Sequence, residues 1–307
     1  MGHESLEGFP PRTTEKVDRL LDLLEEMGEH PLLHGKLALH GGTALNLFML
    51  GIPRLSVDID VSYVGALGRS EMLAERPSVE RGIQEVAKAQ GYSVTGNAGS
   101  HAGRTFVLNY QSQWGPDHVK VDCVYLNRSP VLPLVERATS LMPGLSVLSF
   151  DDAELIGGKV KAFFDRVKVR DLFDIGNLEA LMSAMEPEEE AMAHAVILYY
   201  ASLSASFPFG FEQRTQRFAG LQKELEEQLH PMLSDRVAKP TLNELIEMAD
   251  DFVQARVLPR TDLEKEYLEK FAQGDYKPAL FFEDEAMIHA AISSPQAQWK
   301  LQNIRQM

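Results

Sequence analysis

The sequence predicts a protein of the α/β (α+β) class, in which a domain of strands and helices precedes a helical C-terminal domain. In the first half of the chain, short segments of alternating apolar and polar residues are separated by helical patterns. From residue 151 onward, apolar residues recur almost entirely at helical spacing. We place the boundary in the acidic stretch MEPEEE, so that residues 1–186 and 187–307 form the two predicted domains.

The predicted first domain opens with an amphipathic helix and a strand–glycine–helix unit. The helix is indicated by apolar residues at helical spacing and by the glycine and proline that follow them: Val17, Leu20, Leu21, Leu24 and Met27, then Gly28 and Pro31. Residues 37–40 form a short apolar strand, and the glycines at 41 and 42 make a turn. Residues 43–50 then form a helix that Gly51 and Pro53 end.

The remaining elements of this domain are mostly strands. Residues 57–63 alternate between apolar and polar side chains, as do residues 117–126, and the segments 91–95 and 104–110 are also typical of strands. A helix is predicted over 71–90, weakened by Pro77 and Gly82.

Composition excludes several classes of protein. Hydrophobic residues make up 44% of the 307 residues and charged residues 24%, which is typical of a globular protein. The formal charge of −15 argues against broad attraction to nucleic-acid backbones, because lysines and arginines supply that affinity. With one cysteine, Cys123, no secretory-signal pattern and no apolar run of about 20 residues, we expect a cytoplasmic protein without a disulfide or a membrane segment.

Asp58 and Asp60 are candidate metal ligands. On a strand their Cα atoms lie roughly 6.6 Å apart and their side chains project from one face, while Val57, Ile59 and Val61 occupy the other face. Oxygen ligands in this arrangement suit a hard divalent cation, with Mg²⁺ the best fit. A solvated strand face is the alternative interpretation.

Gly41, Gly42 and Thr43 stand at a strand-to-helix junction and are candidate phosphate ligands. Glycine allows close approach of a ligand to the backbone, and the unpaired N–H groups at a helix N-terminus favour anions. The alternative is a tight turn that requires a positive φ, with Thr43 as the helix cap. No Gly-Lys-Ser/Thr follows, so this is not a Walker A loop.

Asp122 is a candidate third carboxylate. It alternates with Val121 and Cys123 on its strand, so it shares a face with Lys120 and Val124. Opposite the first two aspartates it would complete a two-metal site, or take the proton of an attacking hydroxyl. An exposed strand aspartate is the alternative, and Cys123 is interpreted as a core residue.

Residues 159–170 form the densest basic stretch of the chain. In one continuous helix, Lys159, Arg166 and Arg170 would share a face, because the offsets of 7 and 11 residues are within about 20° of whole turns. The β-branched residues 167 and 169 favour a break instead, after which Asp171 would cap a new helix with Asp174 three residues on. Cations here would neutralise a leaving pyrophosphate.

Two further groups are interpreted as structural. The nine histidines show no spacing typical of a metal site, and we treat them as structural or surface residues. The aromatic cluster at residues 207–211 is interpreted as a corner of the C-terminal core, with a partner-binding patch as the alternative.

Together these residues resemble the AbiEii/AbiGii-type nucleotidyltransferases, the toxins of bacterial toxin–antitoxin systems that include the MenT toxins. The resemblance covers roughly residues 35–180 and depends on the order and spacing of the following residues: Gly41, Gly42, Thr43, Arg54, Ser56, Asp58, Asp60, Asp122, Glu154, Lys159, Arg166, Arg170, Asp171 and Asp174. It implies a polymerase-β-like nucleotidyltransferase fold with a small mixed sheet flanked by helices.

Together, the residue patterns and the resemblance predict a role for each of these positions except Glu154. Asp58, Asp60 and Asp122 are expected to hold Mg²⁺ or Mn²⁺, and these three with Lys159 and Asp171 are expected to be catalytic. The nucleotide is expected to contact the following residues: Gly41, Gly42, Thr43, Arg54, Ser56, Lys159, Arg166, Arg170 and Asp174.

The expected reaction is transfer of a nucleoside monophosphate from an NTP to an acceptor, most simply the 3′ end of tRNA, with an antitoxin protein encoded nearby. Because of the −15 charge, a tRNA acceptor requires a local basic groove, for which residues 159–170, Arg54 and Arg104 are candidates. The alternatives are transfer to a protein or to a small hydroxyl compound, and a nucleotide-binding regulatory module without catalysis.

Overall fold

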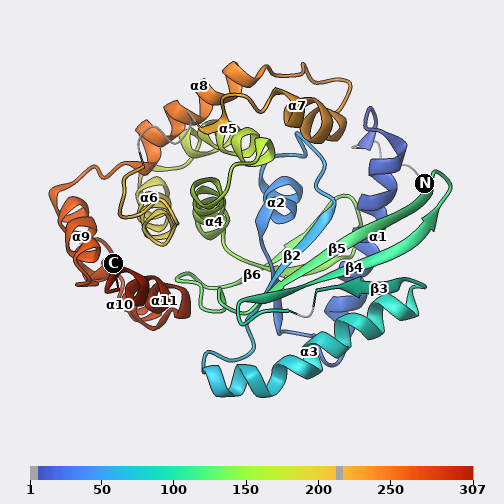
Figure 1. Cartoon of the computed structure of the whole chain (residues 1–307), viewed down its shortest axis with the longest axis horizontal. Coiled ribbons are helices and arrows are strands. Elements are labelled where there is room, and N and C mark those ends of the chain that lie inside the picture. The colour runs from blue at the N-terminus through green and yellow to red at the C-terminus, as the bar shows by residue number, and fades with distance from the viewer. Residues whose placement is uncertain (1–5, 98, 212–216, 307) are drawn as a thin grey trace. The chain divides into compact units, whose positions relative to one another are not determined.

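A seven-stranded mixed sheet forms the centre of the first part of the chain (Figure 1). The computed structural model describes residues 6–97, 99–211 and 217–306. Within these residues the strand order is β3-β4-β5-β2-β1-β7-β6, and the β2–β5 and β1–β7 pairs are parallel. The predicted α/β class with a mixed sheet is therefore confirmed.

The chain divides into two compact units. Unit 1 comprises Met1–Arg128, Leu134–Phe150 and Met232–Val237, and unit 2 comprises Ser129–Pro133, Asp151–Pro231 and Ala238–Met307. Division by contacts thus assigns the helices between residues 151 and 186 to the second unit. The sequence assigns these helices to the first domain, with a boundary at residue 186. That boundary stays a prediction.

Unit 1 holds all of the strands in the described residues. Its elements are α1 (Pro11–Glu29), β1 (Leu37–Leu39), α2 (Gly41–Ala44) with a π-helical continuation (Leu45–Met49), β2 (Asp58–Tyr63), α3 (Arg69–Ala89), β3 (Ser93–Gly96), β4 (Gly103–Ser112), β5 (Gly115–Val124), β6 (Val135–Ala138) and β7 (Ser146–Ser149). The short strands β7 and β6, the last two at one end of the sheet, were not predicted, because four residues each contain too little alternation to be recognised.

The apolar pattern of the sequence accounts for how these elements pack. The predicted apolar stripe of α1 is buried, and α1 contacts α3 as well as β5 and β7. Helix α3 is continuous for 21 residues in spite of Pro77 and Gly82. A Cβ atom at Gly82 would lie 2.9 Å from Leu33, so the glycine permits close packing at this point.

Unit 2 is helical throughout its described residues. It contains α4 (Asp152–Asp165), α5 (Val169–Ser183), α6 (Pro187–Ser202), α7 (Gln222–Glu224) with a π-helical continuation (Leu225–Leu229), α8 (Leu242–Phe252) with a similar continuation (Val253–Val257), α9 (Asp262–Ala272), α10 (Glu285–Ser293) and α11 (Pro295–Ile304). Helix α4 packs on α6, and α5 packs on α8. Nowhere in the described ranges is a helix long and apolar enough to cross a membrane.

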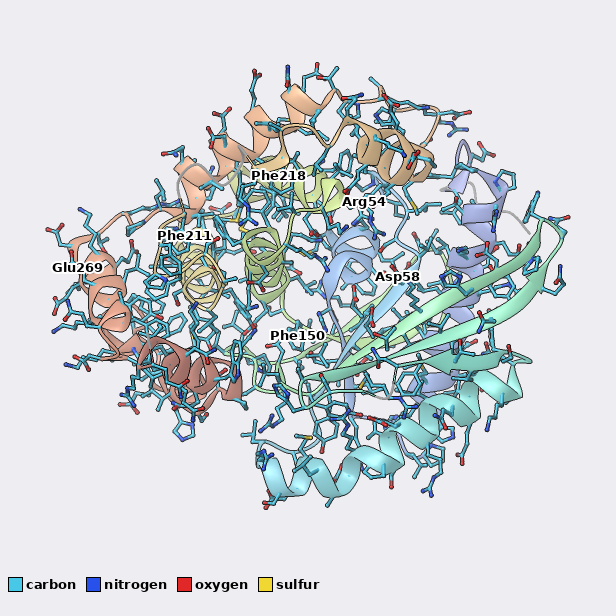
Figure 2. The ribbon with its side chains drawn as sticks, viewed as in Figure 1. Arg54, Asp58, Phe150, Phe211, Phe218 and Glu269 are labelled. Atoms are coloured by element: carbon cyan, nitrogen blue, oxygen red, sulfur yellow. The ribbon has the colours of Figure 1, made fainter. Side chains whose placement is uncertain are left out.

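Aromatic side chains fill the core of unit 2. Phe218 stacks on Phe163 with ring centroids 5.3 Å apart, and Phe211 lies 5.0 Å from Phe164 (Figure 2). Within the cluster at 207–211, Phe207 and Phe211 are buried as the core interpretation predicted, whereas Phe209 is 77% exposed.

Glu154 is a buried carboxyl that ties three segments of unit 2 together. Its Oε1 accepts hydrogen bonds from the backbone N–H groups of Val131 (2.5 Å) and Leu132 (2.8 Å), and its Oε2 accepts one from the Tyr200 hydroxyl of α6. Burial raises the pKa of Glu154 to about 7, against the opposing effect of these three donors. The carboxyl thus links α4, α6 and the segment at 129–133.

We predict that this carboxyl makes stability fall as pH rises from about 4.5 to 7. In that range the native state holds a proton that the unfolded chain has lost, so deprotonation favours unfolding. Urea unfolding followed by circular dichroism should show a loss of about 3 kcal/mol in the wild type and a flatter profile in Glu154→Gln. The exposed control Glu188→Gln should follow the wild type. Equal slopes for Glu154→Gln and the wild type would contradict this assignment.

Candidate active site

Three aspartates project from one face of the paired strands β2 and β5. In the parallel register Asp60 lies opposite Asp122, and Asp58 lies opposite Lys120. The intervening Ile59, Val121 and Cys123 are fully buried on the other face. Because alternate residues of a strand share a face, the predicted shared face of Asp58 and Asp60 (Asp58 is labelled in Figure 2) is confirmed, and the register places Asp122 on the same face.

The N-terminus of α2 is attached to the aspartate strand. Thr43 Oγ1 donates a hydrogen bond of 2.5 Å to the Asp58 carbonyl, and the backbone N–H of His40 donates one of 2.9 Å to the Asp60 carbonyl. The alternative role of Thr43 as a helix cap is wrong, because the N-cap residue is His40 and no side chain caps this helix. Thr43 instead fixes the distance between α2 and β2.

Gly41 lies directly against the Asp60 carboxylate. Its φ is +70°, a conformation that favours glycine, and a Cβ atom at this position would lie 2.3 Å from Asp60 Oδ2. The turn with a positive φ is confirmed at Gly41, and the role of the glycine pair as phosphate ligands stays a prediction. In this structure the Asp60 carboxylate occupies the space that a side chain at position 41 would fill.

His40, the N-cap residue of α2, has a neutral side chain. Desolvation lowers its pKa to about 4, and its ring lies 5.6 Å from the ring of Phe150. The Nε2 atom is buried and has no hydrogen-bond partner among the described residues. A neutral imidazole adds no positive charge beside the carboxylates at physiological pH.

Two neighbours of the carboxylates were not assigned a role from the sequence. Thr105 of β4 lies opposite Asp122, and its hydroxyl donates a short hydrogen bond to Asp122 Oδ1. Lys120 lies opposite Asp58 and is partly exposed on the carboxylate face. Alternation in the predicted strands at 104–110 and 117–126 was the available signal, but the pairing of the strands could not be read from it.

The donor set suits a hard divalent cation, although the carboxylates do not converge on one point. Carboxylate oxygens are the ligands that Mg²⁺ and Mn²⁺ prefer. Within the described part of the chain, however, no group of three or more histidine, cysteine, aspartate or glutamate side chains is arranged to hold a metal ion. Asp122 is oriented by Thr105, and Asp60 packs on Gly41.

Arg54, labelled in Figure 2, is buried on the segment that leads into β2. Ser56 of the same segment is partly exposed. Arg54 is 2% exposed, forms a β-bridge with Leu233 and donates a 3.0 Å hydrogen bond from Nη1 to the Leu55 carbonyl. Arg104, a candidate for a basic groove, is paired with Glu80 at 2.6 Å. Both arginines thus have structural partners within unit 1.

Three residues predicted from the last motif form a buried cluster in unit 2. Lys159 Nζ lies 3.0 Å from Asp171 Oδ1 and 2.7 Å from Asp174 Oδ2, and all three side chains are nearly inaccessible. Arg166 binds Asp171 through two hydrogen bonds of 2.7 and 3.1 Å. Arg170 is partly exposed at the start of α5.

The break between α4 and α5 follows the broken-helix prediction, but the role of Asp171 differs from it. Helix α5 begins at Val169 with Lys168 as its N-cap residue, and no side chain caps it. Asp171 therefore lies inside the first turn and pairs with Lys159 and Arg166. Burial alone would raise the pKa of Asp171, but these two cations outweigh it and hold the pKa well below its usual range.

Comparison with a family model places the chain among the nucleotidyltransferases. The model of the family described as "Nucleotidyl transferase AbiEii toxin, Type IV TA system" matches residues 22–255. The match covers more than half of the chain, and the chain belongs to this family. A toxin of a toxin–antitoxin system implies an antitoxin partner, and a nucleotidyltransferase implies an NTP substrate.

Several solved structures share the fold. MenT4, a nucleotidyltransferase toxin from Mycobacterium tuberculosis, is 16% identical, with a TM-score of 0.51 over 95% of this chain and 92% of that chain. A Helicobacter pylori protein described as a nucleotidyltransferase is also 16% identical, with a TM-score of 0.50 over 85% and 98% of the two chains. At this identity the likeness concerns the fold alone. No match was found among proteins of curated function.

We predict that Gly41→Ala removes activity while Gly51→Ala does not. Both glycines have a positive φ, +70° and +63°, so each alanine carries a similar backbone strain of roughly 1–2 kcal/mol. Only at Gly41 would the new Cβ displace the Asp60 carboxylate, because nothing lies within 4 Å at Gly51. Nucleotidyl transfer should fall about 100-fold or more for Gly41→Ala, with circular dichroism showing that both variants are folded. Equal activity of the two variants would show that the contact is unimportant.

We also predict that Lys159→Met destabilises unit 2 much more than Arg166→Gln. Removing Lys159 leaves two buried carboxylates without their shared cation, at a cost of about 3–5 kcal/mol. The Arg166 side chain is 59% exposed, so its loss should cost about 1 kcal/mol or less. Chemical unfolding of both variants measures the difference. A similar loss of unfolding free energy in the two variants would mean that solvent already screens the cluster of Lys159 with Asp171 and Asp174.

Proposed function

We propose that the chain transfers a nucleoside monophosphate from an NTP to a hydroxyl acceptor, with the 3′ end of tRNA as the expected acceptor. The observation that carries this proposal is the single face shared by Asp58, Asp60 and Asp122, with Gly41 packed on Asp60. Membership of the AbiEii toxin family supports the reaction class. We place the reaction in the cytoplasm, with an antitoxin as the partner that controls it.

The reaction joins the acceptor oxygen to the α-phosphorus and breaks the bond between the α-phosphorus and the oxygen bridging to the β-phosphate, so pyrophosphate leaves. Asp122 is our candidate for the group that takes the acceptor's proton, because Thr105 holds its carboxylate by one oxygen and leaves the other to accept. The first turn of α2 offers its N–H groups to the phosphates. Lys120, opposite Asp58, adds a positive charge on the same face.

A divalent cation, Mg²⁺ or Mn²⁺, held by Asp58 and Asp60 with Asp122 nearby would neutralise charge on the phosphates and the leaving group. The assignment of Lys159, Arg166, Arg170, Asp171 and Asp174 to catalysis or to the nucleotide stays a prediction. Arg54 and Ser56 keep their predicted place near the nucleotide in this proposal, although the burial of Arg54 favours a role in fixing the segment before β2.

The distribution of charge on the chain bears on the choice of acceptor. The net charge is −15, and Arg104 and Arg166, two candidates for a local basic groove, are each paired with a carboxylate. Paired arginines contribute little to binding a polyanion through release of counterions. This observation favours a protein or small hydroxyl compound as the alternative acceptor.

The test is incubation with each labelled NTP in turn, with and without tRNA, followed by separation of RNA, protein and small molecules. We expect label to appear in RNA, to vanish with a chelator and to return with Mg²⁺ or Mn²⁺. Asp58→Ala should abolish transfer. Asp117→Ala is the matched control, because Asp117 is on β5 but faces the other side and pairs with Arg12 and Lys16.

Label in protein or in an added aminoglycoside, and not in RNA, would identify the alternative acceptor. If no acceptor is labelled and calorimetry detects nucleotide binding without pyrophosphate release, the chain is a nucleotide-binding regulatory module. Equal transfer by Asp58→Ala and the wild type would refute the assignment of the carboxylate face.

A further inference from the structure

A cavity opens in unit 1 where strands β1 and β7 separate. The two parallel strands are in register only at Leu39 and Ser149, so the preceding residues of β1 have no partner on β7 in the described sheet. Paired strands lie about 4.8 Å apart, and diverging strands leave space between their side chains. Here that space has a volume of about 590 Å³.

The cavity has an apolar floor built from four elements. Leu24 and Met27 come from α1, Leu39 from β1, Val61 from β2 and Val147 from β7. Each of these side chains is at most 9% exposed. Small-molecule sites typically enclose about 300–1,000 Å³ and are lined mainly by apolar side chains. The volume therefore suits a compact organic ligand, to which the lining offers both apolar and polar surface.

The rim of the cavity is acidic. Glu25, Glu29 and Glu136 line it, and no ion pair of these three is found among the described residues. Glu136 accepts a 2.7 Å hydrogen bond from Ser146, and the one titratable base of the lining is His34, whose Nδ1 donates to the Gly28 carbonyl at 2.8 Å. The C-terminus of α1 ends here, at Glu29, and adds the negative end of a helix dipole.

This cavity is separate from the carboxylate face. Val61 follows Asp60 on β2 and so points to the opposite side of the sheet, and Leu39 lies opposite Val61 in the register. None of the residues assigned to metal or nucleotide lines the cavity. An acidic rim would also repel a triphosphate, which excludes a second nucleotide subsite here.

We propose that the cavity binds a small organic cation, an amine attached to an apolar body. The apolar group occupies the floor between α1 and the separated strands, and the ammonium group lies at the rim among the three glutamates. The proposal concerns binding alone and does not depend on the transfer reaction.

The experiment uses the full chain labelled with ¹³C at its methionine methyl groups. Met27 lines the cavity and reports on it, while Met182, buried in unit 2, serves as an internal control. The probes are 4-phenylbutylamine, 4-phenylbutan-1-ol and 4-phenylbutyrate, which share an apolar body and differ in charge. We expect a saturable shift of the Met27 signal with the amine, and about tenfold or more weaker binding of the carboxylate.

Two variants test the rim. The triple change Glu25→Gln, Glu29→Gln and Glu136→Gln should reduce amine affinity to that of the alcohol and leave the alcohol unchanged. The double change Glu25→Lys and Glu29→Lys should reverse the preference toward the carboxylate. Absence of a saturable Met27 shift with the amine overturns the site, and equal affinity of the wild type for amine and alcohol overturns the ligand class.

Discussion

The parallel pairing of β2 with β5 is the constraint on which the rest of unit 1 depends. It sets Asp60 beside Asp122 and Asp58 beside Lys120, across strands that are more than fifty residues apart in the chain. A slip of one residue would turn Asp122 into the core and expose Val121 in its place. The fully buried side chains of Ile59, Val121 and Cys123 oppose such a slip, so the apolar face holds the polar face in position.

Strand β2 also holds the N-terminus of α2, where the candidate phosphate ligands lie. Thr43 and His40 bond to the carbonyls of Asp58 and Asp60, and Gly41 approaches the Asp60 side chain more closely than any larger residue would allow. The helix N-terminus and the carboxylates are therefore parts of one rigid arrangement. Hydrogen bonds to the backbone of β2 set their separation, and fixed separation favours efficient positioning of reacting groups.

Positive charge in this acidic protein is largely committed to internal partners. Lys159 is shared by two buried aspartates, and Arg104 and Arg166 each bind a carboxylate. A buried pair contributes little net stability, but removal of one member leaves an uncompensated charge. Lys159, Asp171 and Asp174 are therefore expected to stabilise unit 2 whatever they contribute to chemistry, and loss of activity in their variants is to be interpreted with stability measured alongside.

The alternation of residues 57–63 and 117–126, the glycine pair and the order of the motif residues were sufficient to predict the fold class, the shared face of Asp58 and Asp60, and the family. These properties are local, because side-chain direction along a strand and the φ of a glycine depend on near neighbours. Sequence alone did not reveal β6 and β7, the bond from Thr105 to Asp122 or the cluster of Lys159 with Asp171 and Asp174. Those depend on which distant segments meet, and only the packing of the folded chain decides that.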